Sequence, residues 1–200
     1  MTDEIRFRTL LREICQPFRT LSAAETLALW RHYEMMVRWN RKLNLTRITE
    51  LSEAVRRHYA ESIFLASHLS NVTSVIDLGS GAGFPGYPVA VVAPNLQVTL
   101  LESDQRKAAF LRESCGDRKN VRILCQRSVD VAGTWDCVVS RAVRAEDVTI
   151  FAANHVSHIT LLMSAKEGAS AFFSFANRVV HPLPWDATSC LVTADVPRGT

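Results

Sequence analysis

The stretch from Val75 to Gly86, VIDLGSGAGFPG, decides the fold of this chain. It begins with two β-branched apolar residues, passes the acidic residue Asp77, and then has a glycine at every second position from 79 to 83. An apolar run that meets a glycine cluster predicts a buried parallel strand that ends in a tight turn. Glycine has no Cβ, so the backbone of such a turn can lie directly against a ligand. In open α/β sheets, turns at the carboxyl ends of strands bind nucleotide-like cofactors.

Strand and helix patterns alternate from Val72 onward, which predicts a mostly parallel sheet with helical crossovers. The expected strands are residues 74–78, 97–102, 121–125, 136–140 and 159–165, and the expected helices are residues 85–93, 104–115 and 144–154. The tail is different. A helix is expected over 169–176, followed by strands at 178–183 and 189–196 that form a closing antiparallel hairpin.

The first seventy residues have helical rather than strand patterns. Helices are expected over 3–15, over 23–43, and from Ser52 to about Leu69, with a loop over 44–51. The spacing of Ser22 and Glu25 is that of a capping box. The chain is therefore expected to divide into a helical segment, residues 1–71, packed on an α/β domain, residues 72–200.

Composition indicates a globular protein, with 48% hydrophobic and 22% charged residues in a chain of 200. No apolar run approaches the length of a membrane span, and the acidic first residues do not resemble a signal peptide, so a cytoplasmic protein is expected. The five cysteines are odd in number and form no Cys-x-x-Cys pair. They predict buried reduced thiols, with no metal site and no disulfide framework. We expect a monomer.

Positive charge is concentrated in the first part of the chain. Residues 1–60 contain eleven Lys and Arg against seven Asp and Glu, whereas residues 61–200 contain twelve against thirteen. A basic front half suggests a polyanionic partner. The alternative is an ordinary solvated helical surface, and on charge alone this alternative is favoured.

The glycine spacing separates two cofactor classes. Dinucleotide sites favour Gly-x-Gly-x-x-Gly, because the pyrophosphate lies against a helix amino terminus. Here Asp77 is followed by glycines at 79, 81 and 83, a form more typical of S-adenosylmethionine sites. Glu102 stands at the end of the next expected strand, where a carboxylate can accept hydrogen bonds from both ribose hydroxyls. The sequence therefore favours S-adenosylmethionine over a nicotinamide dinucleotide.

The sequence resembles the ribosomal RNA small subunit methyltransferase G family, also called glucose-inhibited division protein B. The segments that carry the resemblance are residues 39–46, 57–62, 77–86, 101–111 and 136–142. The resemblance implies a Rossmann-like S-adenosylmethionine-dependent methyltransferase that modifies N7 of a guanine in 16S ribosomal RNA. Its partner would be that RNA or the small ribosomal subunit.

The resemblance and the glycine turn together imply a set of cofactor-binding residues. These are Asp77, Gly79, Ser80, Gly81, Phe84, Glu102, Ser103, Asp104, Ser128, Val129 and Arg141. Phe84 is expected either to cover the bound cofactor or to be part of the hydrophobic core. Two positions depart from the family pattern: a Glu is usual where Val129 stands, and Glu167 interrupts an expected Lys-Gly pair.

Methylation of guanine N7 does not require a general base, because N7 already has an exposed lone pair. Catalysis then consists of holding N7 in line with the methyl carbon. Arg141, at the end of the fourth strand, is the one catalytic candidate, with a positioning role toward the cofactor carboxylate or the target base. A surface ion pair is the alternative for this residue.

A basic, amide-rich patch at the end of the second helix is a candidate RNA contact. The candidate RNA-binding residues are Asn40, Arg41, Lys42, Asn44, Arg47 and Arg57. The alternative is a helix carboxyl terminus whose basic residues suit the helix dipole. His58 is expected to be structural and Trp39 to be core.

Three other functions remain open. They are methylation of another substrate, a nicotinamide-dependent oxidation, which the glycine spacing disfavours, and RNA binding with a degenerate cofactor pocket.

Overall fold

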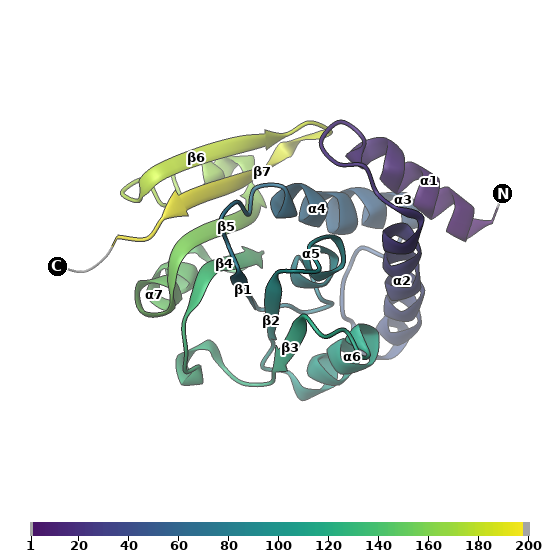
Figure 1. Ribbon diagram of the computed structural model, residues 1–200, viewed down its shortest axis with the longest axis horizontal. Coiled ribbons are helices and arrows are strands. Elements are labelled where there is room, and N and C mark those ends of the chain that lie inside the picture. Colours follow the sequence, from purple (N-terminus) through teal and green to yellow (C-terminus); the bar gives the residue numbers. More distant parts are fainter. Residues whose placement is uncertain (1, 198–200) are drawn as a thin grey trace.

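The structure is a computed structural model that describes residues 2–197, which form a seven-stranded sheet (Figure 1). The sheet order is β3-β2-β1-β4-β5-β7-β6. Strands β1 to β5 are parallel, and β7 runs antiparallel to both β5 and β6. The strands are β1 (Ser74–Leu78), β2 (Gln97–Leu101), β3 (Val121–Leu124), β4 (Trp135–Arg141), β5 (Val156–Ser164), β6 (Ala176–Leu183) and β7 (Asp186–Asp195). The predicted Rossmann-like fold with a terminal hairpin is confirmed.

Strand β1 lies at the point where the strand order reverses. The chain leaves β1 toward β2 and β3, then crosses back to β4 and β5 on the other side. Connections therefore diverge at the carboxyl ends of β1 and β4, which opens a crevice there. The glycine turn of residues 79–83 follows β1 directly, so the sequence places it at this crevice.

Helices cover both faces of the sheet (Figure 1). Alternating side chains of β1 point to opposite faces. Val75 belongs to one buried cluster with α5 (Gly86–Val92) and α6 (Gln105–Cys115), whereas Ile76 belongs to a second cluster with α7 (Ala145–His155). Both faces of the central strand are thus buried, which explains its continuous apolar character.

The amino-terminal helices pack over α5. They are α1 (Asp3–Cys15), α2 (Ala23–Leu43), α3 (Leu51–Ala54), the π-helical turn η1 (Val55–Ala60) and α4 (Glu61–Ala66). Helix α2 begins with the predicted capping box of Ser22 and Glu25. Phe7 and Tyr59 are fully buried in the cluster that also contains α5 and one sheet face. The helical segment therefore shares its core with the sheet.

Two predicted elements differ from the structure. The helix expected from Ser52 is interrupted by η1, and the helix expected over 169–176 is instead α8 (Ala165–Gly168) followed by a turn. The Ser164 side chain accepts a hydrogen bond from the Glu167 backbone and starts α8 early. Phe172 has φ +56° and turns into the core, which prevents a helix there.

Candidate active site

The glycine turn is tied to the end of β2. The backbone N–H groups of Gly79 and Ser80 both donate to the Leu101 carbonyl at 3.0 Å. Gly79 has φ +75° and Gly81 has φ +56°, conformations that residues with a Cβ seldom adopt. The alternating glycines are therefore required by the backbone path of the turn.

Asp77 lies beneath the turn and is fully buried. Its Oδ2 accepts a hydrogen bond from the Gly86 backbone N–H at 2.9 Å, and its Oδ1 has no partner among residues 2–197. Burial raises the pKa of Asp77 to about 7, although the hydrogen bond from Gly86 opposes this shift. Asp77 thus joins the end of β1 to the start of α5 and supports the turn from below.

Glu102 follows β2 and connects three backbone segments. Its Oε2 accepts from the Gly81 backbone N–H at 2.9 Å, and its Oε1 accepts from the Asp104 backbone N–H at 2.8 Å. Asp104 in turn caps α6 by accepting from Arg106 and Lys107 backbone N–H groups. The Glu102 carboxylate is therefore held at the rim of the turn with a fixed orientation.

A pocket of about 470 Å³ opens beside the turn, and we call it the turn pocket. It lies at the carboxyl ends of β1, β2 and β3. Its lining residues are Leu78, Gly79, Leu101, Glu102, Ser103, Gln126, Arg127, Ser128, Val129, Val143 and Asp147. Five of the expected cofactor-binding residues are in this set, namely Gly79, Glu102, Ser103, Ser128 and Val129.

The other expected cofactor residues lie outside this lining. Asp77, Ser80, Gly81 and Asp104 support the turn and its neighbours. Phe84 is buried, and its ring stacks on His58 with 4.3 Å between centroids and meets the edge of Tyr59. Of the two roles expected for Phe84, this position corresponds to the core role.

Arg141 lines a second pocket, of about 590 Å³, which we call the arginine pocket. Its Nη1 donates to the Arg57 carbonyl at 2.5 Å and lies 2.7 Å from His58 Nδ1. Burial and the nearby Arg141 charge lower the pKa of His58 to about 3, so His58 is neutral and accepts this hydrogen bond. The buried His58 has the structural position that the sequence predicts.

The expected RNA-binding residues fall into two groups. Arg41, Lys42, Asn44 and Arg47 are exposed at the end of α2 and in the following loop. The Asn40 amide instead bridges this loop, because it donates to the Thr46 carbonyl and accepts from the Thr46 N–H. Arg57 lies apart from the patch, in the arginine pocket. The patch is therefore mainly three cations and one amide.

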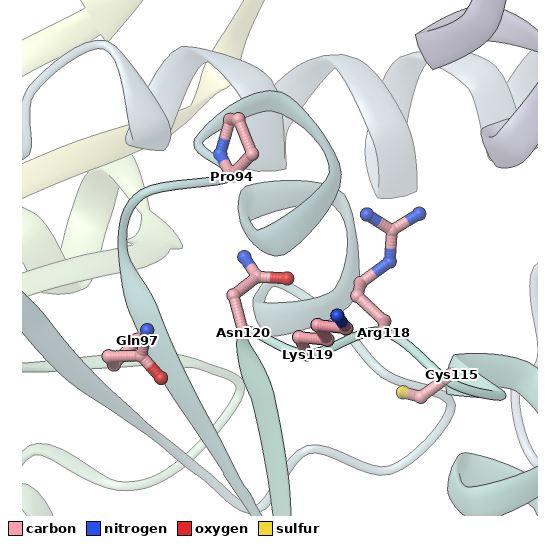
Figure 2. Close-up of a pocket in the computed structure, with 6 residues that line it drawn as sticks. All are labelled: Pro94, Gln97, Cys115, Arg118, Lys119 and Asn120. Atoms are coloured by element: carbon pink, nitrogen blue, oxygen red, sulfur yellow. The ribbon is translucent and has the colours of Figure 1, made fainter.

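A third pocket, of about 420 Å³, lies at the opposite edge of the sheet (Figure 2). Figure 2 shows Pro94, Gln97 and Asn120 around it, near the amino ends of β2 and β3. The Asn120 side chain donates to three backbone carbonyls, and Arg118 lies over the Tyr87 ring at 5.6 Å. These side chains hold the fold together, and parallel sheets bind ligands at the other edge.

Within residues 2–197, no helix is long and apolar enough to cross a membrane. The same residues contain no group of three or more His, Cys, Asp or Glu side chains arranged to hold a metal ion.

Solved structures with a similar fold include proteins described as methyltransferases. A predicted O-methyltransferase from Agrobacterium tumefaciens superposes with a TM-score of 0.56 at 26% identity, over 67% of this chain and 79% of that one. A putative RNA methyltransferase from Pyrococcus horikoshii superposes with a TM-score of 0.56 at 16% identity, over 84% of this chain and all of that one. The fold, with the glycine turn at the carboxyl end of β1, is that of the Rossmann-like methyltransferases.

Sequence comparison identifies the family. The model of the rRNA small subunit methyltransferase G family matches residues 26–171, and the chain belongs to this family. The ribosomal RNA small subunit methyltransferase G of Xanthomonas euvesicatoria is 37% identical over 128 residues, 62% of this chain and 60% of that protein. The Chloroflexus aggregans protein of the same name is 32% identical over 181 residues, 85% of this chain and 76% of that protein. The chain thus matches about three fifths of the Xanthomonas relative's length.

Several pocket-lining residues were not predicted from the sequence. Among them, Val143 and Asp147 line the turn pocket from just before α7 and from its first turn, and Glu61 lines the arginine pocket from α4. The spacing of Arg57 and Glu61, one helical turn apart, was the available signal for an ion pair. Nothing in the local sequence connects either residue to Arg141.

Proposed function

We propose that this protein transfers a methyl group from S-adenosylmethionine to N7 of a guanine in 16S ribosomal RNA. The observation that carries the proposal is the turn pocket, in which Gly79 and Glu102 meet at the carboxyl edge of the sheet. Family membership supports the reaction class. Because the Xanthomonas relative is matched over only 60% of its length, the substrate remains part of the proposal.

The residues of the turn pocket fit the cofactor. Gly79 presents exposed backbone to the pocket, which leaves room for the amino-acid end of S-adenosylmethionine. Glu102 has two carboxylate oxygens whose orientation is fixed by Gly81 and Asp104, and these suit the two ribose hydroxyls. Ser128 and Val129 form the far wall, where the adenine would lie.

The chemistry requires alignment rather than acid or base catalysis. When the cofactor is bound, the guanine N7 lone pair forms the new N–C bond while the C–S bonding pair leaves with sulfur, so the positive charge moves to the purine. The protein's part is to hold the base and exclude water around the reacting atoms. No proton has to be removed from N7, so the reaction needs no general base.

The exposed cations at the end of α2 and in the following loop support an RNA partner. Arg41, Lys42 and Arg47 are exposed in the helical segment and would contact phosphates. We assign RNA contact to residues 1–71 and cofactor binding to residues 72–200. A monomer acting in the cytoplasm on 16S ribosomal RNA or the small subunit completes the proposal.

Tritiated methyl transfer to 16S ribosomal RNA and to small subunits, with identification of the labelled nucleoside, tests this function. We expect 7-methylguanosine, and heat from S-adenosylmethionine but not from NAD in calorimetry. Gly79→Leu should reduce methyl transfer about 100-fold or more, since its Cβ would lie 3.1 Å from Val143 and its side chain would fill the pocket.

Gly116→Leu is the matched control. Gly116 also has a positive φ, but no atom lies within 4 Å of its added Cβ. The control variant should keep its activity. Full activity of Gly79→Leu would show that the cofactor binds elsewhere, and labelling of another nucleoside would contradict the guanine assignment.

The exposed Val129 favours one second candidate. It stands where the family usually has Glu, and 81% of its surface is exposed. An RNA-binding protein with a degenerate cofactor pocket would have lost such a carboxylate. The absence of heat with S-adenosylmethionine would support this second function and exclude the first.

A further inference from the structure

The turn pocket has two ends. At the first end the glycine turn meets Val143, whose Cγ2 lies 3.1 Å from the position that a Cβ on Gly79 would occupy. At the far end, Ser128 and Val129 form the wall. A smaller pocket of about 310 Å³ adjoins this wall, and Ser128, Val129 and Asp147 line both pockets. Asp147 therefore belongs to the far end of the turn pocket, where the two pockets meet.

The carboxylate of Asp147 is held in one orientation from its own helix turn. Asp147 lies in the first turn of α7, and its side chain is half-buried. Arg144 Nε donates to Asp147 Oδ2 at 3.0 Å, and Arg144 Nη2 donates to Asp147 Oδ1 at 3.1 Å. Such a fork fixes the plane of the carboxylate, while each oxygen can accept a further hydrogen bond. Asp147 thus offers oriented acceptors at the far end of the pocket.

The other polar side chains of the turn pocket are less suited to accept a hydrogen bond there. Both oxygens of Glu102, the second carboxylate of the lining, already accept from backbone N–H groups. Arg127 has donors only. The Gln126 amide donates to the Asp130 carbonyl at 3.2 Å, and its neutral oxygen is a weaker acceptor than a carboxylate. Asp147 is therefore the strongest acceptor that the ribose and the turn leave available.

We propose that Asp147 recognises the adenine of S-adenosylmethionine by accepting a hydrogen bond from its exocyclic amino group, with Arg144 as the positioning residue, an inference that rests on the proposed function. The adenine amino group is a donor with two hydrogens. Asp147 accepts one of them, and the apolar side chain of Val129 accepts neither. A hypoxanthine base has a carbonyl oxygen at the same carbon, so it would place an acceptor against the carboxylate and be rejected.

Two acids lie in the first turn of α7, and only one of them lines the pocket. Glu146 and Asp147 both suit the positive end of the helix dipole. Glu146 is exposed and lines neither the turn pocket nor the smaller pocket beside it. Helix stabilisation would be shared by both acids, whereas recognition of adenine belongs to Asp147 alone. Glu146→Gln is therefore the matched control for Asp147→Asn.

Calorimetry with S-adenosylmethionine compares Asp147→Asn, Arg144→Gln and Glu146→Gln. We expect Asp147→Asn to weaken the Kd about tenfold, because a neutral amide replaces a charged acceptor. Arg144→Gln should weaken it about threefold, since the carboxylate remains but loses its fixed plane. Glu146→Gln should keep the Kd within about twofold of the wild type. Circular dichroism shows that each variant is folded, and an unchanged Kd in Asp147→Asn would overturn the inference.

A deaminated ligand tests the contact with the amino group itself. S-inosylhomocysteine has a carbonyl oxygen at the carbon where S-adenosylhomocysteine has its amino group. The wild type should bind the adenine compound about 30-fold more tightly or better. In Asp147→Asn the side-chain amide can turn its NH2 group toward the carbonyl oxygen, so this preference should fall about tenfold. A merely structural role for Asp147 would leave the preference unchanged, which would contradict the inference.

Moving the carboxylate across the far wall completes the test. Residues 129 and 147 line the same end of the pocket, so the double variant V129E/D147N supplies an acceptor from the other side. It should recover a Kd for S-adenosylmethionine within about threefold of the wild type, together with the preference for S-adenosylhomocysteine. Without recovery, the loss in Asp147→Asn would be due to pocket shape, and the inference would be wrong. A wild type that binds neither adenine compound would instead refute the proposed function.

Discussion

Two buried carboxylic acids, Asp77 beneath the glycine turn and Glu61 in the arginine pocket, lie at the same edge of the sheet. Burial raises the pKa of each to about 7. Their partners differ. Asp77 accepts a hydrogen bond from the backbone of Gly86, nine residues further along the chain. Glu61 faces the side chains of Arg57 in the preceding turn η1 and of Arg141 on the distant strand β4.

The partners of Asp77 lie within the same short stretch of sequence, so the local sequence determines the turn. The arginine cluster around Glu61 instead forms only when distant segments come together in the fold. A carboxylate bound to backbone fixes a chain path, so changes near Asp77 should affect stability most. A carboxylate between guanidinium groups fixes side chains, so changes near Glu61 should affect activity most. Two substitutions, each with a control variant, and one titration with two further variants test this contrast.

Gly86→Ala should have the largest effect on stability. A Cβ at Gly86 would lie 2.3 Å from Leu100 Cδ2 and 2.7 Å from Asp77 Oδ2, so it would force apart α5 and β1. Overpacking of this kind costs about 3 kcal/mol in the free energy of unfolding. Urea denaturation followed by circular dichroism measures it.

Gly116→Ala is the control for that measurement. Gly116 has φ +50° and open space around it, so only backbone strain applies, at about 1 kcal/mol. Equal destabilisation by Gly86→Ala and Gly116→Ala would show that the close contact between Asp77 and Gly86 does not stabilise the glycine turn.

The same contrast explains which parts of the fold and of the site could be predicted from the sequence. The strand, the turn and the following helix were predicted correctly, because apolar patterning and glycine spacing are local signals. Gly79, Glu102 and Val129 line the turn pocket as expected for residues that follow consecutive strands of a parallel sheet. Parallel topology brings such positions to one edge whatever the details of packing.

The features missed depend on contacts between distant segments. The interruption of the third helix by η1 places His58 against Arg141 and Phe84, and no local pattern predicts such a π-helical turn. Glu61 was overlooked because its partner Arg141 lies on β4. The Asn40 amide was expected to face RNA, but the fold uses it to close the loop at Thr46.

A titration of stability tests the two acids together. For a carboxyl whose pKa is raised on folding, the native state retains a proton that the unfolded chain has released. Its stabilisation is therefore present below about pH 4 and is lost as the pH rises toward 7. Each acid therefore lowers the free energy of unfolding across this range, by up to about 1.4 kcal/mol per pH unit. His32 and His58 act in the opposite direction up to about pH 6.5, because burial lowers the pKa of each to about 3.

Relative to the wild type, Asp77→Asn and Glu61→Gln should each remove one of the two falling contributions from the slope of stability against pH, and only Glu61→Gln should also reduce methyl transfer strongly. Urea denaturation at half-unit pH steps from 4.5 to 7.5 gives the slopes. Slopes that are the same in the wild type and in both variants would show that neither acid holds its proton in the folded state.

Val129→Glu should have the smallest effect on stability and should affect cofactor binding alone. Val129 is 81% exposed at the rim of the turn pocket, so a longer polar side chain replaces no core contact and should change stability by less than about 0.5 kcal/mol. A carboxylate there adds an acceptor for the adenine amino group, worth about 1 kcal/mol or a fivefold tighter Kd for S-adenosylmethionine. Calorimetry measures this change, with Val129→Gln as the uncharged control of similar length. If Val129→Glu binds the cofactor no more tightly than the wild type, the adenine is held through the backbone of Ser128 and Val129. In that case the departure from the family pattern has no effect on cofactor affinity, because the pocket wall at this position depends on the chain path rather than on the side chain.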